Sequence, residues 1–369
     1  MKSDSAQPTP DFPSTIVVPM VSGIGNALMT QPMVRVLRGC LPRVRVVVLA
    51  LTRAMAEPFE RLHDPGTETR VTGKGTRGIA RLVRESRRLL PDAFVVPFPS
   101  NRWQYNALAA SSGAKQVILH AYPADHRAMF YNTKATRVPA VRGVHDVLQN
   151  LSLLEPLGVK VPAGVDVAPR FEVSDDELEK ARALLNHDDT PFVVIHAGSA
   201  KSMLAQAKRW PPESYARLID GLCTLDDRRV VLVEGPDEQG IGRSILSFSR
   251  HASSSGRFSI LSLACPLGVS AAVLKRASLY VGTDSGLAHL AAAVGTPTVT
   301  LFAPADPSRV CPFGHEHGVI QPERACSPCF MYPWESTRPR MKCRAPFCIE
   351  TITPDRVLTR VLARVRETA

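Results

Sequence analysis

The sequence contains few aromatic residues and no long hydrophobic run. Aromatic residues make up 6% of its 369 positions. Hydrophobic residues make up 44%, which is ordinary for a soluble globular protein. The longest apolar stretch, residues 290–305, is interrupted by Gly295-Thr296-Pro297 and is shorter than the ~20 residues that a membrane-spanning helix requires. We therefore predict a soluble protein without a membrane-spanning helix.

The beginning of the sequence lacks the pattern of a secretory signal peptide. Residues 1–13 are polar and contain proline, so we expect them to be disordered, and the apolar run of residues 16–20 is too short for a signal peptide. The protein is therefore expected in the cytoplasm, either free or peripherally at the inner face of the cell membrane. In that reducing compartment, its eight cysteines are expected to be thiols or metal ligands rather than disulfides.

Acidic residues are scarce in the first half of the chain. Residues 1–165 contain 21 Lys and Arg against 11 Asp and Glu, a net charge of +10, whereas residues 166–369 contain 24 against 23, a net charge of +1. This asymmetry favours an anionic partner, such as a lipid headgroup or a phosphorylated glycan, although a basic surface that only aids solubility has the same pattern. Nucleic acid is not expected, because no zinc-finger, helix-turn-helix or RNA-binding signature is present.

The length and the spacing of apolar runs predict two α/β domains of roughly 150 residues each. Runs rich in β-branched residues predict strands at 15–18, 44–51, 93–96, 116–119, 192–196, 230–233, 279–281 and 298–302, and amphipathic stretches predict helices at 27–39, 76–90 and 354–365. Alternation of strands with helices is typical of parallel, Rossmann-like sheets. Residues 158–173 predict a linker, because they have little periodicity and precede a capping box of Ser174 and Glu177.

Residues 278–290 predict a strand, a tight turn and a helix. Small residues from Gly282 to Gly286 form the turn, and the backbone N–H groups and positive dipole end of the following helix suit a diphosphate. An ordinary strand-helix junction, capped by Asp284 or Ser285, would have the same pattern. The functional interpretation therefore depends on further segments of the sequence.

Four segments carry a family resemblance. The sequence GTDSGLAHLAAAVGTPTVTLF (282–302) resembles the signature of the heptosyltransferase-type glycosyltransferases, glycosyltransferase family 9, and residues 23–42, 196–219 and 230–239 are similar to other motifs of that family in the same order. The resemblance implies the GT-B fold, with an acceptor-binding domain (14–165) and a nucleotide-sugar-binding domain (166–352) facing a central cleft, followed by a helix (353–369). It also implies inverting transfer of a sugar, first of all heptose from ADP-heptose, to a glycan, lipopolysaccharide-type or protein acceptor, without a catalytic metal.

The resemblance assigns donor-binding roles to Ser199, Lys208, Glu238, Asp284, Ser285, Gly286 and His289. Lys208 would stabilise the negative charge of the departing diphosphate, and Glu238 would accept ribose hydroxyls. Because a carboxylate beside a diphosphate would repel it, Asp284 is expected to cap the turn or to accept a sugar hydroxyl. His289 is either a ligand contact or a packed side chain.

The residue after Gly25 departs from the pattern of many relatives, which have an acid there as the favoured general base. Asn26 occupies this position, and an amide does not accept a proton at neutral pH, so Asn26 is expected only to orient the acceptor. The unranked candidates for the base include Asp92, His120, Asp125, His126 and Asp146. The main alternative is a catalytically silent protein that binds a nucleotide sugar.

Two further features are a cysteine cluster and an arginine stripe. Cys326, Cys329, Cys343 and Cys348 have the finger-like spacing of a structural Zn or Fe site, although four reduced thiols would have the same sequence. Arg77, Arg81, Arg84 and Arg88 lie on one side of a predicted helix, with Ile79, Leu82, Val83 and Leu90 on the other. Such a stripe is usually a solvated face, but it is also suited to anionic lipid or phosphorylated glycan.

Overall fold

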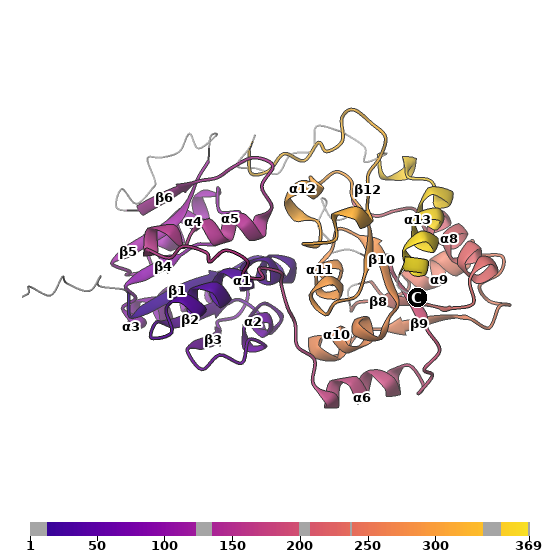
Figure 1. Ribbon diagram of the computed structural model, residues 1–369, viewed down its shortest axis with the longest axis horizontal. Helices are drawn as coiled ribbons and strands as arrows, with labels where there is room; N and C mark the ends of the chain where they lie inside the picture. Colours follow the sequence, from indigo (N-terminus) through magenta and orange to yellow (C-terminus); the bar gives the residue numbers. More distant parts are fainter. Residues whose placement is uncertain (1–12, 123–134, 199–206, 237, 335–347, 368–369) are drawn as a thin grey trace, which may run out of the picture. The chain divides into compact units, whose positions relative to one another are not determined.

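The computed structural model in Figure 1 describes residues 13–122, 135–198, 207–236, 238–334 and 348–367. The chain divides into two compact units, and each is described by itself. Unit 1 contains residues 1–22, 32–141 and 147–167, and unit 2 contains residues 23–31, 142–146 and 168–369. The last passage of the chain from one unit to the other, after residue 167, lies within the segment 158–173 that was predicted as a linker.

Unit 1 is built on a parallel six-stranded sheet with the strand order β3-β2-β1-β4-β5-β6. The strands are β1 (Thr15–Met20), β2 (Arg45–Ala50), β3 (Thr67–Val71), β4 (Ala93–Val95), β5 (Gln116–Ala121) and β6 (Ala135–Pro139). The helices are α1 (Ile24–Cys40), α2 (Arg53–Glu60), α3 (Gly75–Leu89), α4 (Trp103–Ala110) and α5 (Asp146–Ser152), with a 3-10 turn η2 (Glu155–Leu157). Residues 24–31 of α1 and Asp146 of α5 belong to unit 2. Leu82 of α3 and Leu108 of α4 pack with Val17, Val47 and Phe94 on one face of the sheet.

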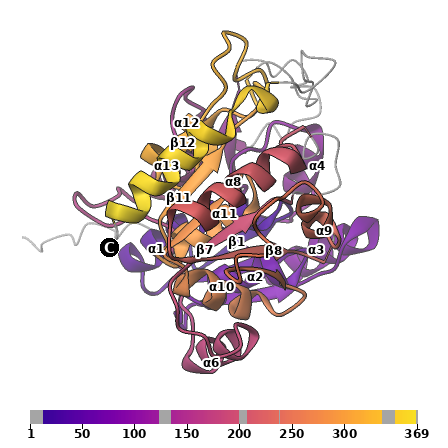
Figure 2. The same ribbon diagram turned by 90° about the vertical axis from the view of Figure 1, so that its right-hand side faces the viewer.

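Unit 2 repeats this topology with the strand order β12-β11-β10-β7-β8-β9. Its strands are β7 (Phe192–His196), β8 (Arg229–Glu234), β9 (Phe258–Ser262), β10 (Leu279–Thr283), β11 (Thr298–Leu301) and β12 (Val319–Ile320). Its helices are α6 (Asp175–Leu184), α8 (Pro212–Leu225), α9 (Ile241–Leu246), α10 (Leu267–Arg276), α11 (Gly286–Ala293), α12 (Pro307–Val310) and α13 (Pro354–Glu367), with 3-10 turns η3 (Glu316–Gly318) and η4 (Ile349–Thr351). Figure 2 shows α8 and α13 on one face of this sheet and α10 and α6 on the other, which matches its two buried clusters.

The structure confirms the predicted strands and adds the ones that the sequence did not reveal. All eight predicted strands are present, with ends shifted by at most two residues, and α6 begins with the predicted capping box of Ser174 and Glu177. The four strands that were not predicted, β3, β6, β9 and β12, are the edge strands of the two sheets. Within the described residues, no helix is both long enough and apolar enough to cross a membrane.

Each sheet has one point at which the order of its strands reverses. In unit 1 this point lies between β1 and β4, and in unit 2 it lies between β7 and β10. Doubly wound sheets bind ligands outside the carboxyl ends of the strands at this switch point. The two places where the fold predicts a ligand are therefore the loops after Met20 and Val95, and the loops after His196 and Thr283.

Candidate functional site

The loop after β10 leaves the start of α11 open to a ligand. Ser285 is the N-cap residue and has an extended backbone, but its side chain makes no capping hydrogen bond. The first N–H groups of a helix have no acceptor within the helix, so those of Gly286 and Leu287 point toward the carboxyl edge of the sheet with the positive end of the dipole. The cap is Ser285 rather than Asp284, so the capping role considered for Asp284 is not what the structure shows.

Asp284 instead forms an ion pair with Lys208. The Lys208 ammonium contacts Oδ2 of Asp284, and the two side chains are only 17% and 9% exposed. Because both groups are largely removed from water, each would be unfavourable without the other. The pair holds a cation beside the open start of α11, which brings together two residues that are far apart in the sequence.

Behind this pair lies a buried hydrogen-bonded network. Nε2 of His196 lies 2.8 Å from Oε2 of Glu238, and Nδ1 lies 3.2 Å from the Tyr280 hydroxyl. The Ser285 hydroxyl lies 3.2 Å from that of Tyr280, so the network reaches the start of α11. These contacts position Ser285 and Glu238 on opposite sides of the β7 end.

Glu238 is ionised and tightly enclosed. Burial alone would raise the pKa of its carboxyl, but the hydrogen bond and charge of His196 and the N–H group of Gly235 outweigh it and lower the pKa. Gly198 makes room for this side chain, because a Cβ atom at residue 198 would lie 1.9 Å from Cδ of Glu238. Among the described residues, both hydrogen bonds that this carboxylate accepts go to Oε2.

The amino-terminal loop packs directly on the first turn of α11. A Cβ atom at residue 25 would lie 2.8 Å from Cδ2 of His289, and one at residue 286 would lie 2.2 Å from Cγ2 of Ile24. These two glycines therefore permit a reciprocal close contact between motifs that are more than 250 residues apart. Half-buried Asn26 follows directly, so the structure brings it to the edge where Asp284, Ser285 and Gly286 lie.

His289 is a packed side chain in this arrangement. It is 7% exposed and lies against the backbone of Gly25. Burial lowers the pKa of its imidazole from 6.5 to about 4, which outweighs the opposing attraction of Asp284. The imidazole is therefore neutral at pH 7.

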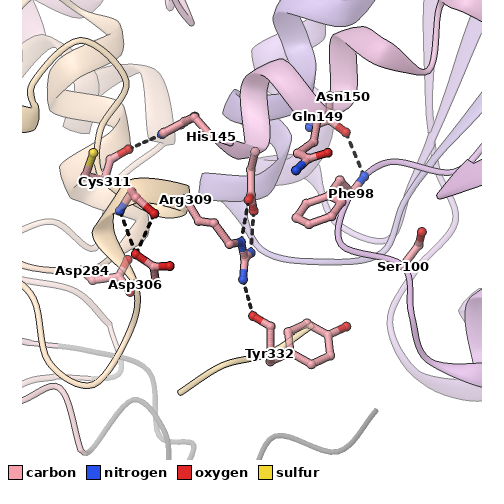
Figure 3. Close-up of polar contacts among 12 residues, drawn as sticks. Phe98, Ser100, His145, Gln149, Asn150, Asp284, Asp306, Arg309, Cys311 and Tyr332 are labelled. Carbon is pink, nitrogen blue, oxygen red and sulfur yellow. Dashed lines mark hydrogen bonds and ion pairs between the residues drawn. The ribbon is translucent and has the colours of Figure 1, made fainter. Parts of the chain in front are cut away.

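A second buried cluster, which the sequence did not reveal, connects three distant segments of unit 2 (Figure 3). Nε and Nη2 of Arg309 lie 2.9 and 2.8 Å from the two carboxylate oxygens of Asp146, and Nη1 donates to the carbonyl of Tyr332. Nε2 of the neighbouring His145 lies 2.8 Å from the carbonyl oxygen of Cys311. No sequence signal marks this cluster, because Asp146 and Arg309 are 163 positions apart.

Three candidates for the general base have structural roles instead. Asp146 is fully buried in its ion pair with Arg309. His120 is fully buried, and its ring nitrogens face the carbonyl oxygens of Val138 and Gln149, while burial lowers its pKa to about 4. Asp92 binds Lys115 and the start of β1, which is the edge of the sheet opposite to the switch point. Asp125 and His126 lie outside the described residues, as does Ser199 among the donor-binding candidates.

The structure does not assemble the predicted metal site from the residues it describes. Cys326 is exposed, Cys329 is buried and Cys348 is half-buried, while Cys343 lies outside the described residues. In the described ranges, no group of three or more His, Cys, Asp or Glu side chains is placed to hold a metal ion. The structural Zn or Fe site stays a prediction.

The arginine stripe lies on α3 as predicted. Arg77, Arg81, Arg84 and Arg88 are exposed, and Leu82 is buried in the core on the other side of the helix. Only Arg88 of these four forms an ion pair among the described residues, with Glu85. Leu90 was expected on the apolar side, but it is the C-cap in a left-handed conformation and is 74% exposed.

Comparisons with known proteins agree with this geometry. A family model described as glycosyltransferase family 9 (heptosyltransferase) matches residues 107–337. Lipopolysaccharide heptosyltransferase 1 of Pseudomonas aeruginosa is 27% identical over 199 residues, which cover 52% of this chain and 53% of that protein. The matched segment thus spans about half the length of that relative.

Two solved structures have the same fold. An Escherichia coli structure described as ADP-heptose lipopolysaccharide heptosyltransferase II has a TM-score of 0.70 and 21% identity, and the match covers 96% of this chain and 100% of that one. The dodecameric iron-containing heptosyltransferase TibC of enterotoxigenic E. coli, in complex with ADP-D-beta-D-heptose, has a TM-score of 0.57 and 18% identity, covering 97% and 78%. These likenesses establish the GT-B fold, with its two Rossmann-like units.

Proposed function

Because the chain belongs to glycosyltransferase family 9, the heptosyltransferases, we propose that it transfers heptose from ADP-heptose to a glycan acceptor with inversion at the anomeric carbon. The observation that carries the proposal is the content of the unit 2 switch point. There the open start of α11, the Lys208 ammonium and the Glu238 carboxylate lie at the edge where a doubly wound sheet binds nucleotides.

The donor diphosphate would take the place of the Asp284 carboxylate at the Lys208 ammonium. Its oxygens would accept from the first N–H groups of α11 and from Lys208, whose ammonium contacts Oδ2 of Asp284. As the bond between the anomeric carbon and the phosphate oxygen breaks, ADP leaves with the electron pair, and the fixed positive charge stabilises it. The acceptor oxygen forms the new bond and gives its proton to a general base.

Asn26 would orient the acceptor hydroxyl without taking its proton. It lies beside the open end of α11, as the contact of Gly25 with His289 requires, and an amide offers both a donor and an acceptor. The base is then a different group from Asn26 and from Asp92, His120 and Asp146, which are held in structural contacts.

The same observations support a second candidate function. With an amide at residue 26 and three candidate bases engaged elsewhere, the chain would bind a nucleotide sugar without transferring it. The two functions differ in one measurable property, the release of ADP from bound donor.

The acceptor is proposed to be anionic, either a lipopolysaccharide-type glycan or a glycosylated protein, and the protein is proposed to act in the cytoplasm. Arg77, Arg81 and Arg84 on α3, which form no ion pair with another described residue, would provide salt-sensitive attraction to such an acceptor or to the inner membrane surface. Charge reversal of these three arginines should weaken binding to phosphorylated glycan at low salt, and equal binding would assign them to plain solvation.

The four cysteines are proposed to hold one structural Zn or Fe ion per chain. The support is the spacing of the thiols and the iron content of TibC. Elemental analysis of protein purified without chelator should show about one ion per chain, which is lost when Cys326 and Cys329 are both changed to Ser. Metal-free protein of normal stability would contradict this.

The donor assignment is tested by calorimetry with ADP-, GDP-, UDP- and dTDP-sugars. ADP-heptose should bind most tightly, and Ser285→Trp should abolish binding because the indole fills the turn. Lys275→Ala removes an exposed lysine of α10, is the matched control for loss of the lysine charge in Lys208→Ala, and should bind the donor like the parent. Binding of ADP-heptose to Ser285→Trp with the affinity of the parent would show that the donor site lies elsewhere.

A further inference from the structure

The switch point of unit 1 carries an exposed tryptophan that takes no part in the proposed donor site. Trp103 is the first residue of α4, and its side chain is 51% exposed. The other two tryptophans, Trp210 and Trp334, are 2% and 7% exposed. α4 already contributes Leu108 and Ala109 to the core, so its packing does not depend on Trp103.

The loop that presents Trp103 is firmly anchored. The N–H group of Phe98 donates to Oδ1 of Asn150 at 2.8 Å, and the N–H group of Ser100 donates to the Tyr122 hydroxyl at 2.7 Å. Ser100 and Asn101 are buried, at 0% and 2% exposure. Figure 3 shows Phe98 of this loop beside Asn150 of α5. A rigid, buried loop that ends in an exposed indole is preorganised for binding.

The same segment is connected to the other strand of the switch point. The Tyr105 side chain, one turn into α4, hydrogen-bonds to Ser22, which follows β1, and burial raises the pKa of the Tyr105 phenol. The start of α4 therefore lies beside the end of β1, where the topology places a ligand. Exposed Arg102 precedes Trp103 directly, and its positive charge acts on the Tyr105 phenol.

We propose that Trp103 is the sugar-stacking platform of the acceptor site, with Arg102 binding an acidic group of the same sugar. The polarised C–H groups of a pyranose ring pack on the negative face of an indole, and a guanidinium binds phosphate or carboxylate through two parallel hydrogen bonds. The ligand is thus an acidic oligosaccharide. This inference rests on the proposed glycosyl transfer and adds the residues that recognise its acceptor.

An exposed tryptophan beside an arginine is also found where proteins contact membrane interfaces. The position of Trp103 favours the sugar, because it lies at the ligand-binding end of the sheet and is anchored by buried polar contacts. Two other apolar side chains of unit 1 are exposed at least as much as Trp103. Leu90 ends α3 at the opposite edge of the sheet, and Val141 follows β6, the edge strand two places from β4. A membrane-binding surface would gather such side chains together.

The test uses the single exposed indole as its own probe. Acrylamide should quench one of the three tryptophans of the full-length protein, and the Trp103→Phe variant should lose this quenchable component. Phosphorylated core oligosaccharide, released from lipopolysaccharide and free of lipid, should protect the parent from quenching. Anionic vesicles of phosphatidylglycerol should not. Protection by vesicles but not by oligosaccharide would overturn the proposal in favour of a membrane contact.

Kinetics with the same oligosaccharide complete the test. Trp103→Ala should raise the KM for the oligosaccharide roughly five- to tenfold, the range expected for the loss of one aromatic stacking contact, with an unchanged Kd for ADP-heptose. Phe248→Ala, which removes another exposed aromatic ring from unit 2, is the matched control and should change neither constant. A parent-like KM in Trp103→Ala would refute the stacking role, whereas failure of the parent to bind ADP-heptose would refute the proposed function instead.

Discussion

The two switch points have the same strand topology and opposite chemical character. At the switch point of unit 2, ionisable groups lie in contact and largely out of water, as Lys208 with Asp284 and His196 with Glu238 show. At the switch point of unit 1, neutral buried groups hold a loop that leads to the exposed residues Arg102 and Trp103. Identical scaffolds thus carry different ligand chemistry in their loops, as expected if one unit binds a diphosphate and the other a sugar ring.

Removal of the largely buried cation of unit 2 should have the largest effect. Lys208→Ala should lower turnover by roughly 10²-fold or more, because a fixed charge at the leaving group acts mainly in the transition state. Donor affinity should also fall, and both are measured by ADP release and calorimetry. Lys275→Ala should behave like the parent. If Lys208→Ala turns over normally, the ammonium does not stabilise the leaving group.

The next largest effect separates a structural carboxylate from a catalytic one. Asp146→Asn should destabilise the protein by about 3–5 kcal/mol, because it leaves buried Arg309 without its counterion. Asp176→Asn removes an exposed pair with Lys180 and should change the free energy of unfolding by only about 0.5 kcal/mol. Denaturant unfolding measures both. Normal stability of Asp146→Asn with lost turnover would instead identify Asp146 as the base.

The reciprocal glycine contact is tested by one added methyl group. Gly25→Ala should displace His289 or the loop that carries Asn26, and so reduce turnover more than donor binding. Gly39→Ala is the control, because a Cβ atom at residue 39 meets no atom within 4 Å, and it should stabilise α1 by about 0.5–1 kcal/mol. Equal turnover of the two variants would show that the contact is not needed for the reaction.

The smallest effect is the pH dependence of the free energy of unfolding, to which one buried histidine of each unit contributes. Burial lowers the pKa of His120 and of His289 from 6.5 to about 4. Between these values the unfolded chain binds more protons than the folded one, so stability is lost as the pH falls from 6.5 toward 4. His120→Asn should flatten the pH dependence of the unfolding free energy in this window. An unchanged slope would mean that His120 does not titrate as its burial predicts.

The central strands could be predicted from the sequence because they are buried on both faces. Each of the strands β1, β2, β7 and β10 is a short apolar run that is separated from the next one by turn residues or a helix. Edge strands lack this signal, since β3 reads Thr-Glu-Thr-Arg-Val and is half-exposed. Because an edge strand borders solvent, it can contain polar residues. Such a segment becomes a strand by pairing with its neighbour and not because its amino-acid composition favours one.

The sequence indicates a candidate donor site where its residues are contiguous, and not where distant segments meet. The turn from Gly282 to Gly286 indicates an anion site by its residue types alone. The pairing of Lys208 with Asp284, the packing of Gly25 on His289 and the ion pair of Asp146 with Arg309 depend on tertiary structure. A sequence pattern does not contain those distances, so the role of Asp284 and the structural role of Asp146 required the structure.

Consumption of the bound donor tests the proposed transferase activity most directly. Purified protein is mixed with ADP-heptose and acceptor-containing cell extract, and release of ADP is followed together with calorimetric binding of the donor. We predict binding and ADP release by the parent, with a modest reduction in Asn26→Ala. Donor binding without any release of ADP from the parent, and with release restored in Asn26→Asp, would contradict the enzymatic account and identify a silent nucleotide-sugar-binding protein.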